Sequence, residues 1–171
     1  MPATKDGLHR MLEFFVYGIL KSAESVGNAH LFLRMIEENG LRRFMTVNMP
    51  DLQTSSDPVQ ACREYTKHVD KSGLFDGSDT LFSGNGDEVR AEIGERCIYR
   101  RVCTMRSDEH LQVHCIRSVA LAEMLRVRLK ADFTPRLEEF GLPCHLELRR
   151  AQGKPKSLVA VGQPKSEWLT P

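Results

Sequence analysis

Hydrophobic residues in the first 75 positions recur at intervals of three and four, the spacing that places side chains along one face of an α-helix. The pattern predicts a first helix over Lys5–Ser25, a second from about Ala29 to Asn39-Gly40, and a third that begins at Pro58 and ends near Gly73. Asn-Gly tolerates the left-handed conformation that commonly ends a helix, and proline is favoured at the first helical position. Three amphipathic helices are therefore expected in this part of the chain.

The same spacing predicts which side of each helix is buried. The expected inward residues are Leu8, Met11, Leu12, Phe15, Ile19, Ala23 and Val26 in the first helix, Leu31, Phe32, Met35 and Ile36 in the second, and Val59, Cys62, Tyr65, Thr66 and Val69 in the third.

From Asp79 the hydrophobic period changes to two, which is the period of a β-strand. Asn85-Gly86 is a favoured two-residue hairpin turn, so a β-hairpin is expected around it. A further helix is expected from about Cys115 to Lys130, and two short strands at 144–149 and 157–161, with Leu146 and Leu148 turned inward.

Together these elements predict an α+β fold: N-terminal helices packed on an antiparallel sheet of about four strands, with a long helix in the C-terminal half. A chain of 171 residues suits one domain with its own core. We expect that domain over 1–161, with the helices in 1–75 and the hairpin, cysteine-rich segment, helix and strands in 79–161. Residues 162–171, which include Trp168, are expected to form a flexible tail.

The net charge of +1 is an average over two unlike halves. Up to Glu88 there are 9 basic and 13 acidic side chains, and from Val89 onward there are 15 and 10. Nucleic acid is not the expected partner of the basic half, because only Tyr99 and Phe133 lie among its basic residues as stacking platforms. A solvated face with ion pairs between the halves explains the charges equally well.

Neither membrane insertion nor secretion is expected. The sequence has no run of 18 apolar residues, and its most apolar early stretch, Met11 to Leu20, contains Glu13 and lacks a cleavage site after it. The five cysteines are an odd number at irregular spacing, which favours reduced thiols in a cytoplasmic protein.

Four of the cysteines fall in the basic half at the expected ends of elements: Cys97, Cys103, Cys115 and Cys144. No pair has the two-residue spacing of a zinc knuckle, yet element ends packed in one layer can converge. Four thiolates there would suit zinc or an iron–sulfur cluster, with Arg96, Arg100, Arg101 and Arg117 stabilising the negative charge. The alternative is that these cysteines, like Cys62, are small buried residues of the core.

A catalytic interpretation uses the same residues. Cys115 is the best candidate nucleophile, because it opens a helix and stands beside His114. Adjacent residues on a helix do not face each other, however, so the pair is not in itself a catalytic dyad.

The order of a hairpin, Cys97-Ile98-Tyr99-Arg100, Cys103, a helix opened by Cys115, and Glu138-Glu139 before Cys144 resembles the 4-vinyl reductase domain, also called the hydrocarbon-binding domain. The resemblance covers roughly 79–150. It implies a ligand-sensing or ligand-carrying α+β domain that can involve a metal, is usually dimeric, and has its pocket between the helices and the sheet.

The leading hypothesis is therefore a cytoplasmic small-molecule-binding or sensor domain for a small apolar or anionic ligand, a homodimer with a metal or redox-sensitive cysteine centre. A second hypothesis is a small cysteine-dependent hydrolase, similar in its late-cysteine layout to the 2-aminothiazoline-4-carboxylate hydrolases, with Cys115 as nucleophile and the arginines holding an anionic substrate. A third is a structural partner-binding module.

Overall fold

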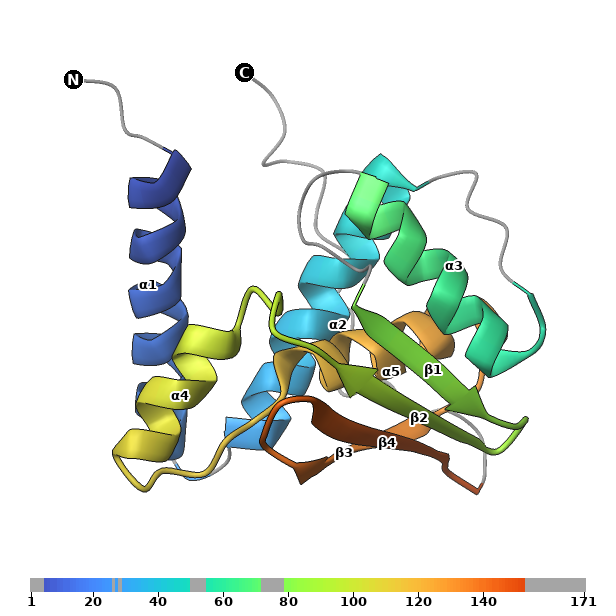
Figure 1. Cartoon of the computed structure of the whole chain (residues 1–171). Helices are drawn as coiled ribbons and strands as arrows, with labels where there is room; N and C mark the ends of the chain where they lie inside the picture. The colour runs from blue at the N-terminus through green and yellow to red at the C-terminus, as the bar shows by residue number, and fades with distance from the viewer. Residues whose placement is uncertain (1–4, 26, 28, 50–54, 72–78, 153–171) are drawn as a thin grey trace, which may run out of the picture.

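The computed structural model of the chain describes residues 5–25, 27, 29–49, 55–71 and 79–152. These residues form five helices and four strands (Figure 1): α1 (Lys5–Ser25), α2 (Ala29–Asn48), α3 (Pro58–Lys71), β1 (Thr80–Gly84), β2 (Glu88–Ile93), α4 (Arg100–Asp108), α5 (Ile116–Leu129), β3 (Phe133–Glu139) and β4 (Cys144–Arg150). The predicted α+β class is confirmed.

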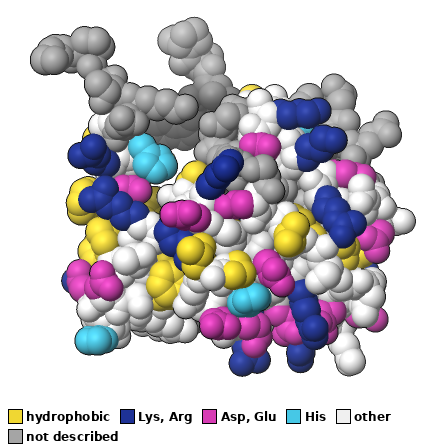
Figure 2. Space-filling view, viewed as in Figure 1, with side chains coloured by type: hydrophobic (Ala, Val, Ile, Leu, Met, Phe, Trp, Pro, Cys, Tyr) yellow, Lys and Arg dark blue, Asp and Glu magenta, His cyan; other side chains and the backbone are white. Residues whose placement is uncertain are grey.

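The four strands make one antiparallel sheet in the order β1-β2-β4-β3. Val89 pairs with Leu148 and Ala91 with Leu146, and all four side chains are buried. Helices α3 and α5 contact the strands on this hydrophobic side. The other face carries charged residues, among them Arg90 and Glu92, which explains the strict alternation along β2 (Figure 2).

The helices form two packing units around this sheet. Helix α2 runs against α5, and together with α3 they close the main core over the sheet. Helix α1 packs on α4 to one side (Figure 1), where Leu20, Leu33, Val102 and Ile116 make a second, smaller core. The turn leading into α4 therefore lies between the two units.

Helix α3 matches its prediction closely. It begins at Pro58, and the Asp57 side chain caps it by accepting a hydrogen bond of 2.7 Å from the backbone N–H of Gln60. The five residues predicted to face inward, Val59, Cys62, Tyr65, Thr66 and Val69, are all buried.

The predictions for α2 are wrong in two respects. The helix continues through Asn39-Gly40 to Asn48, because Leu41 and Met45 extend its buried stripe into the main core. Packing over these two turns outweighs the helix-ending tendency of Asn-Gly. The predicted inward residues Leu31, Phe32, Met35 and Ile36 are instead 37–40% exposed, while Leu33 is buried.

Helix α1 shows a similar difference. Met11, Leu12 and Phe15 are more than half exposed, and burial is concentrated at Leu20 and Ala23, where α1 meets its neighbours. The hydrophobic spacing identified the helix but not the side that packs.

The sheet differs from its prediction in two places. Gly84 pairs with Val89, which centres the hairpin turn on Gly86 and Asp87, one residue later than expected. Strand β3 was not predicted. It contains Pro135 and is an edge strand, where a missing backbone N–H is tolerated. The strand expected at 157–161 and the tail at 162–171 lie outside the described residues.

None of the described helices combines the length and the apolar character needed to cross a bilayer.

Candidate functional site

A pocket of about 390 Å³ lies among the helices. Residues from all five helices and from the turn before α4 line it, and none of the described lining residues belongs to a strand. The pocket thus lies among helices and not, as the family resemblance implies, between helices and sheet. Most of the wall is apolar, including Leu12, Val16, Ile36, Phe44, Val69 and Leu121.

A few polar groups line the same pocket. They come from five parts of the chain: His9 and Glu13 on α1, Glu37 on α2, Tyr65 and Thr66 on α3, Tyr99 before α4, and Arg117 on α5. The two tyrosines interact electrostatically with each other and with both Glu37 and Arg117, so these four groups lie near one another and, with Thr66 beside Tyr65 in the sequence, form what we call the polar end of the pocket. Burial, helped by repulsion from Glu123, raises the pKa of Glu37 to about 7, and burial also raises the pKa of Tyr65 and Tyr99.

The four cysteines named from the sequence line a second cavity, of about 20 Å³. Cys97 follows β2, Cys103 lies in α4, Cys115 caps α5, and Cys144 starts β4. The structure therefore brings together residues that are up to 47 positions apart in the sequence. Cys62 lies elsewhere, in the main core, as predicted.

Two thiols of this cysteine cluster, those of Cys103 and Cys115, are neutral at neutral pH. Burial raises the pKa of Cys103 to about 12, and the neighbouring Cys115, Cys97 and Cys144 add to the effect. Burial also raises the pKa of Cys115 to about 11, although hydrogen bonds with Ser118 act in the opposite direction. Cys144 donates to the carbonyl oxygen of Gly141 at 3.3 Å.

The metal prediction finds no support in the arrangement of the ligands. Within the described part of the chain, no group of three or more His, Cys, Asp or Glu side chains is placed so that it could hold a metal ion. The cysteine cavity is about the size of one water molecule. Zinc or an iron–sulfur cluster at these cysteines therefore stays a prediction, and it would require the four thiols to move.

Two of the four predicted arginines reach the cysteine cluster. Arg100 lines the cavity, donates to the carbonyl oxygens of Gly94 (2.9 Å) and Gly141, and lies over the ring of Phe140. Arg117 also lines it and donates to Thr80 Oγ1 at 3.0 Å. The contacts of Arg100 join the turn after β2 to the β3–β4 loop, and the contact of Arg117 joins α5 to β1.

The other two arginines lie away from the cysteine cavity. Arg101 lies 3.4 Å from Glu13 and over the ring of Phe14, on the α1 side of the molecule. Arg96 is exposed, and its backbone N–H donates to Asp79.

His114 does not line the cysteine cavity. Its Nε2 lies 3.6 Å from Glu24 Oε1 on α1, beside the fully buried Arg106, which also pairs with Glu24. Because His114 is directed to this pair and the pKa of Cys115 is raised, the structure gives the hydrolase hypothesis no activated thiolate.

The two cavities are neighbours. Tyr99 and Arg117 line both of them, and Tyr99 interacts electrostatically with Cys97 and Cys115. The polar end of the larger pocket thus adjoins the cysteine cluster. Thr66 was predicted to face inward with the stripe of its helix but was not predicted to bind a ligand. Glu37 was not predicted at all, and its one signal was its place next to Ile36, a residue of a hydrophobic stripe.

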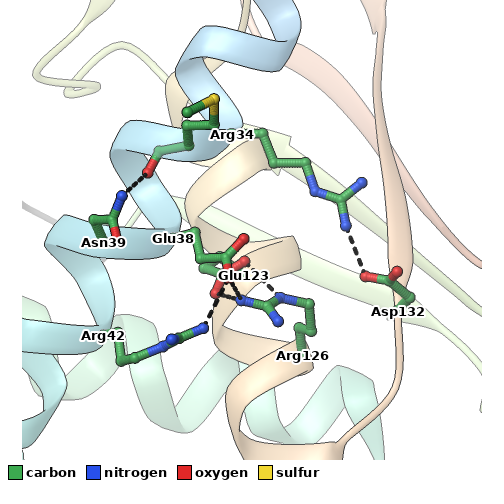
Figure 3. A network of polar contacts seen from close by, with 8 residues as sticks. Arg34, Glu38, Asn39, Arg42, Glu123, Arg126 and Asp132 are labelled. Atoms are coloured by element: carbon green, nitrogen blue, oxygen red, sulfur yellow. Dashed lines mark hydrogen bonds and ion pairs between the residues drawn. The ribbon is translucent and has the colours of Figure 1, made fainter. Parts of the chain in front are cut away.

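A buried ionic network joins α2 to α5 at Glu38, the residue that follows Glu37 in the sequence (Figure 3). Glu38 and Glu123, almost fully buried, share Arg126, which lies 2.9 Å from Glu38 Oε1 and donates to Glu123 Oε2 at 2.8 Å. Arg42 also pairs with Glu38 at 2.9 Å. The network fixes α2 against α5 and therefore fixes the pocket wall that both helices supply.

Comparisons with known proteins leave this site without a template: no family model, curated protein or solved structure matches the chain. The resemblance to the 4-vinyl reductase domain accordingly stays a hypothesis.

Proposed function

We propose that this chain is a small-molecule-binding or sensor domain whose ligand occupies the helix-lined pocket. The observation that carries the proposal is the pocket itself: about 390 Å³, mostly apolar, with a few polar groups that converge at one end. That combination is typical of sites that bind small molecules. A cytoplasmic location fits this role and the five reduced cysteines.

Oxidation of the cysteine cluster would alter the ligand pocket, although the raised pKa values make the thiols of Cys103 and Cys115 slow to react at neutral pH. Four thiols line one cavity, and two residues of its wall, Tyr99 and Arg117, are also wall residues of the ligand pocket. Any change in the bonding of the thiols would therefore alter the polar end of the pocket. The alternative is that the same four cysteines bind a metal ion or cluster.

A pocket-filling substitution tests the binding role. Gly40 lines the pocket within α2, and a Cβ built there meets no atom within 4 Å. Gly40→Leu would add an apolar side chain at the pocket wall, where its Cβ has room, and would also remove a helical glycine. The matched control is Gly18→Leu on α1, where a Cβ likewise meets nothing but the residue does not line the pocket.

The assay is fluorescence titration with N-phenyl-1-naphthylamine, an uncharged apolar probe. We expect the wild-type chain and Gly18→Leu to bind it and Gly40→Leu to lose at least about tenfold in affinity, which corresponds to about 1.4 kcal/mol. Equal binding by Gly40→Leu, or no binding by the wild-type chain, would refute the proposal.

A further inference from the structure

We infer that the pocket selects an uncharged ligand, an apolar molecule with one carbonyl or hydroxyl oxygen that is bound by Glu37, Tyr65, Thr66 and Tyr99. The inference rests on the proposed function and adds the chemical class of the ligand. It follows from three properties of the polar end of the pocket: its hydroxyl groups, its balance of charge and the state of Glu37.

Hydroxyl groups dominate the polar end. Tyr65, Thr66 and Tyr99 all line the pocket, and burial keeps both tyrosines protonated, because it raises their pKa. Thr66 is only 4% exposed, and its Oγ1 has no hydrogen-bond partner among the described residues. A buried hydroxyl is normally hydrogen-bonded, so an oxygen of a ligand would complete this site.

Both signs of charge line the same end once Glu37 is ionised, and neither sign of ligand charge is then favoured. Glu37, once ionised, would repel a carboxylate, and Arg117 would repel an ammonium group. Either charged group would also lose its hydration on entering a mostly apolar pocket. Glu13, the other lining carboxylate, is already close to Arg101 and His9. An uncharged oxygen avoids all of these costs.

Glu37 adds a dependence on pH. The titratable and charged groups that face it or share its pocket are Glu123 and Arg117 from α5, Tyr65 from α3, Tyr99 before α4, and His9 and Glu13 from α1. Its pKa of about 7 means that it is protonated at pH 6 and can donate to a carbonyl oxygen. At pH 8.5 it is ionised and can only accept. Affinity for a ketone should therefore fall as the pH rises through 7.

Displacement of N-phenyl-1-naphthylamine by three compounds of equal chain length, 2-octanone, octanoate and octylamine, tests the inference at pH 8.5, where Glu37 is ionised and offsets the charge of Arg117. We expect 2-octanone to bind at least about tenfold more tightly than either charged compound at this pH, and to gain roughly threefold in affinity at pH 6. In Glu37→Gln, which keeps the shape and a donor, the affinity for 2-octanone should no longer depend on pH.

Thr66→Val separates a binding role from a structural one, because valine keeps the shape and removes the hydroxyl. It should weaken 2-octanone binding roughly threefold to tenfold, with affinity for the naphthylamine probe and the melting temperature unchanged. Thr46→Val, at an exposed position of α2, is the control. Unchanged 2-octanone affinity in Thr66→Val would overturn the assignment of the oxygen site.

The two proposals fail in different ways. If the probe binds and Gly40→Leu blocks it, but octanoate or octylamine binds more tightly than 2-octanone, the inference about ligand class is wrong and the binding function stands. If neither the probe nor any of the three compounds binds, both are overturned.

Discussion

At the scale of single residues, the interior of this protein contains ionisable groups whose partners come from distant parts of the chain. Among the residues that the structure describes, Arg106 is the largest fully buried side chain; it pairs with Glu24 of α1 and donates to the carbonyl oxygen of Gln112 at 2.9 Å. It thereby links α4, α1 and the segment before α5. Such a residue cannot be recognised from sequence, where an arginine in a short polar helix is expected to be exposed.

Removing Arg106 should destabilise the fold. Arg106→Met would leave the Gln112 carbonyl and the partly buried Glu24 without their partner, so we expect a loss of about 2–3 kcal/mol in the free energy of unfolding, measured with urea. Arg90→Met removes an exposed pair with Glu88 and should cost less than about 0.5 kcal/mol. Equal effects of the two changes would show that the buried contacts of Arg106 do not stabilise the fold.

The thiols of Cys103 and Cys115 should react slowly with alkylating reagents at neutral pH. Because the pKa values of Cys103 and Cys115 are raised to about 12 and about 11, the thiolate fraction at pH 7.5 is small. Labelling with iodoacetamide, followed by mass spectrometry, should remain slow for both cysteines until the pH exceeds about 10, and unfolding in urea should abolish this protection. Rapid labelling of Cys115 near pH 7 would instead favour the hydrolase hypothesis.

At the scale of elements, the sequence predicted structure well where a pattern is completed locally. Helix α3 has its proline and its buried stripe within 15 residues, and both of these predictions held, with Asp57 capping the helix from the preceding position. The buried faces of α1 and α2 were mispredicted because their partners, α4 and α5, are about 80 residues away. The same limit applies to the site. The four cysteines could be named from the sequence, but the pocket could not, because it depends on how five helices meet.

The network between α2 and α5 should be stabilising only when complete. Arg126→Met would leave Glu38 and Glu123, both almost fully buried, without the cation they share, and we expect a loss of about 3–5 kcal/mol in stability. Urea unfolding measures this loss. Arg42→Met, which removes a partly exposed partner of Glu38, should cost clearly less. A similar loss in the two variants would contradict the special role of Arg126.

At the scale of the whole molecule, the exposed side of α1 carries large hydrophobic side chains. Met11, Phe14 and Phe15 are each more than half exposed, and hydrophobic side chains are visible on this part of the surface (Figure 2). Exposed apolar patches of this kind commonly mark contacts between proteins. The homodimer expected from the family resemblance would have a suitable surface here.

Sedimentation velocity tests that expectation. The wild-type chain should sediment as a dimer, and Phe14→Glu with Phe15→Glu should sediment as a monomer that keeps its helical circular dichroism. A wild-type monomer, or a dimer that persists when both changes are made, would show that this surface is not a dimer interface.

If a small molecule binds among the helices, beside the cysteine cluster, an uncharged apolar reagent should label the residues of that pocket. Photolabelling with 3-phenyl-3-(trifluoromethyl)diazirine, with labelled residues located by mass spectrometry, tests this. Labels are expected on pocket residues such as Phe44, Val69 and Leu121, and they should be lost in Gly40→Leu. Labels confined to the exposed side of α1, unchanged in Gly40→Leu, would contradict binding in this pocket.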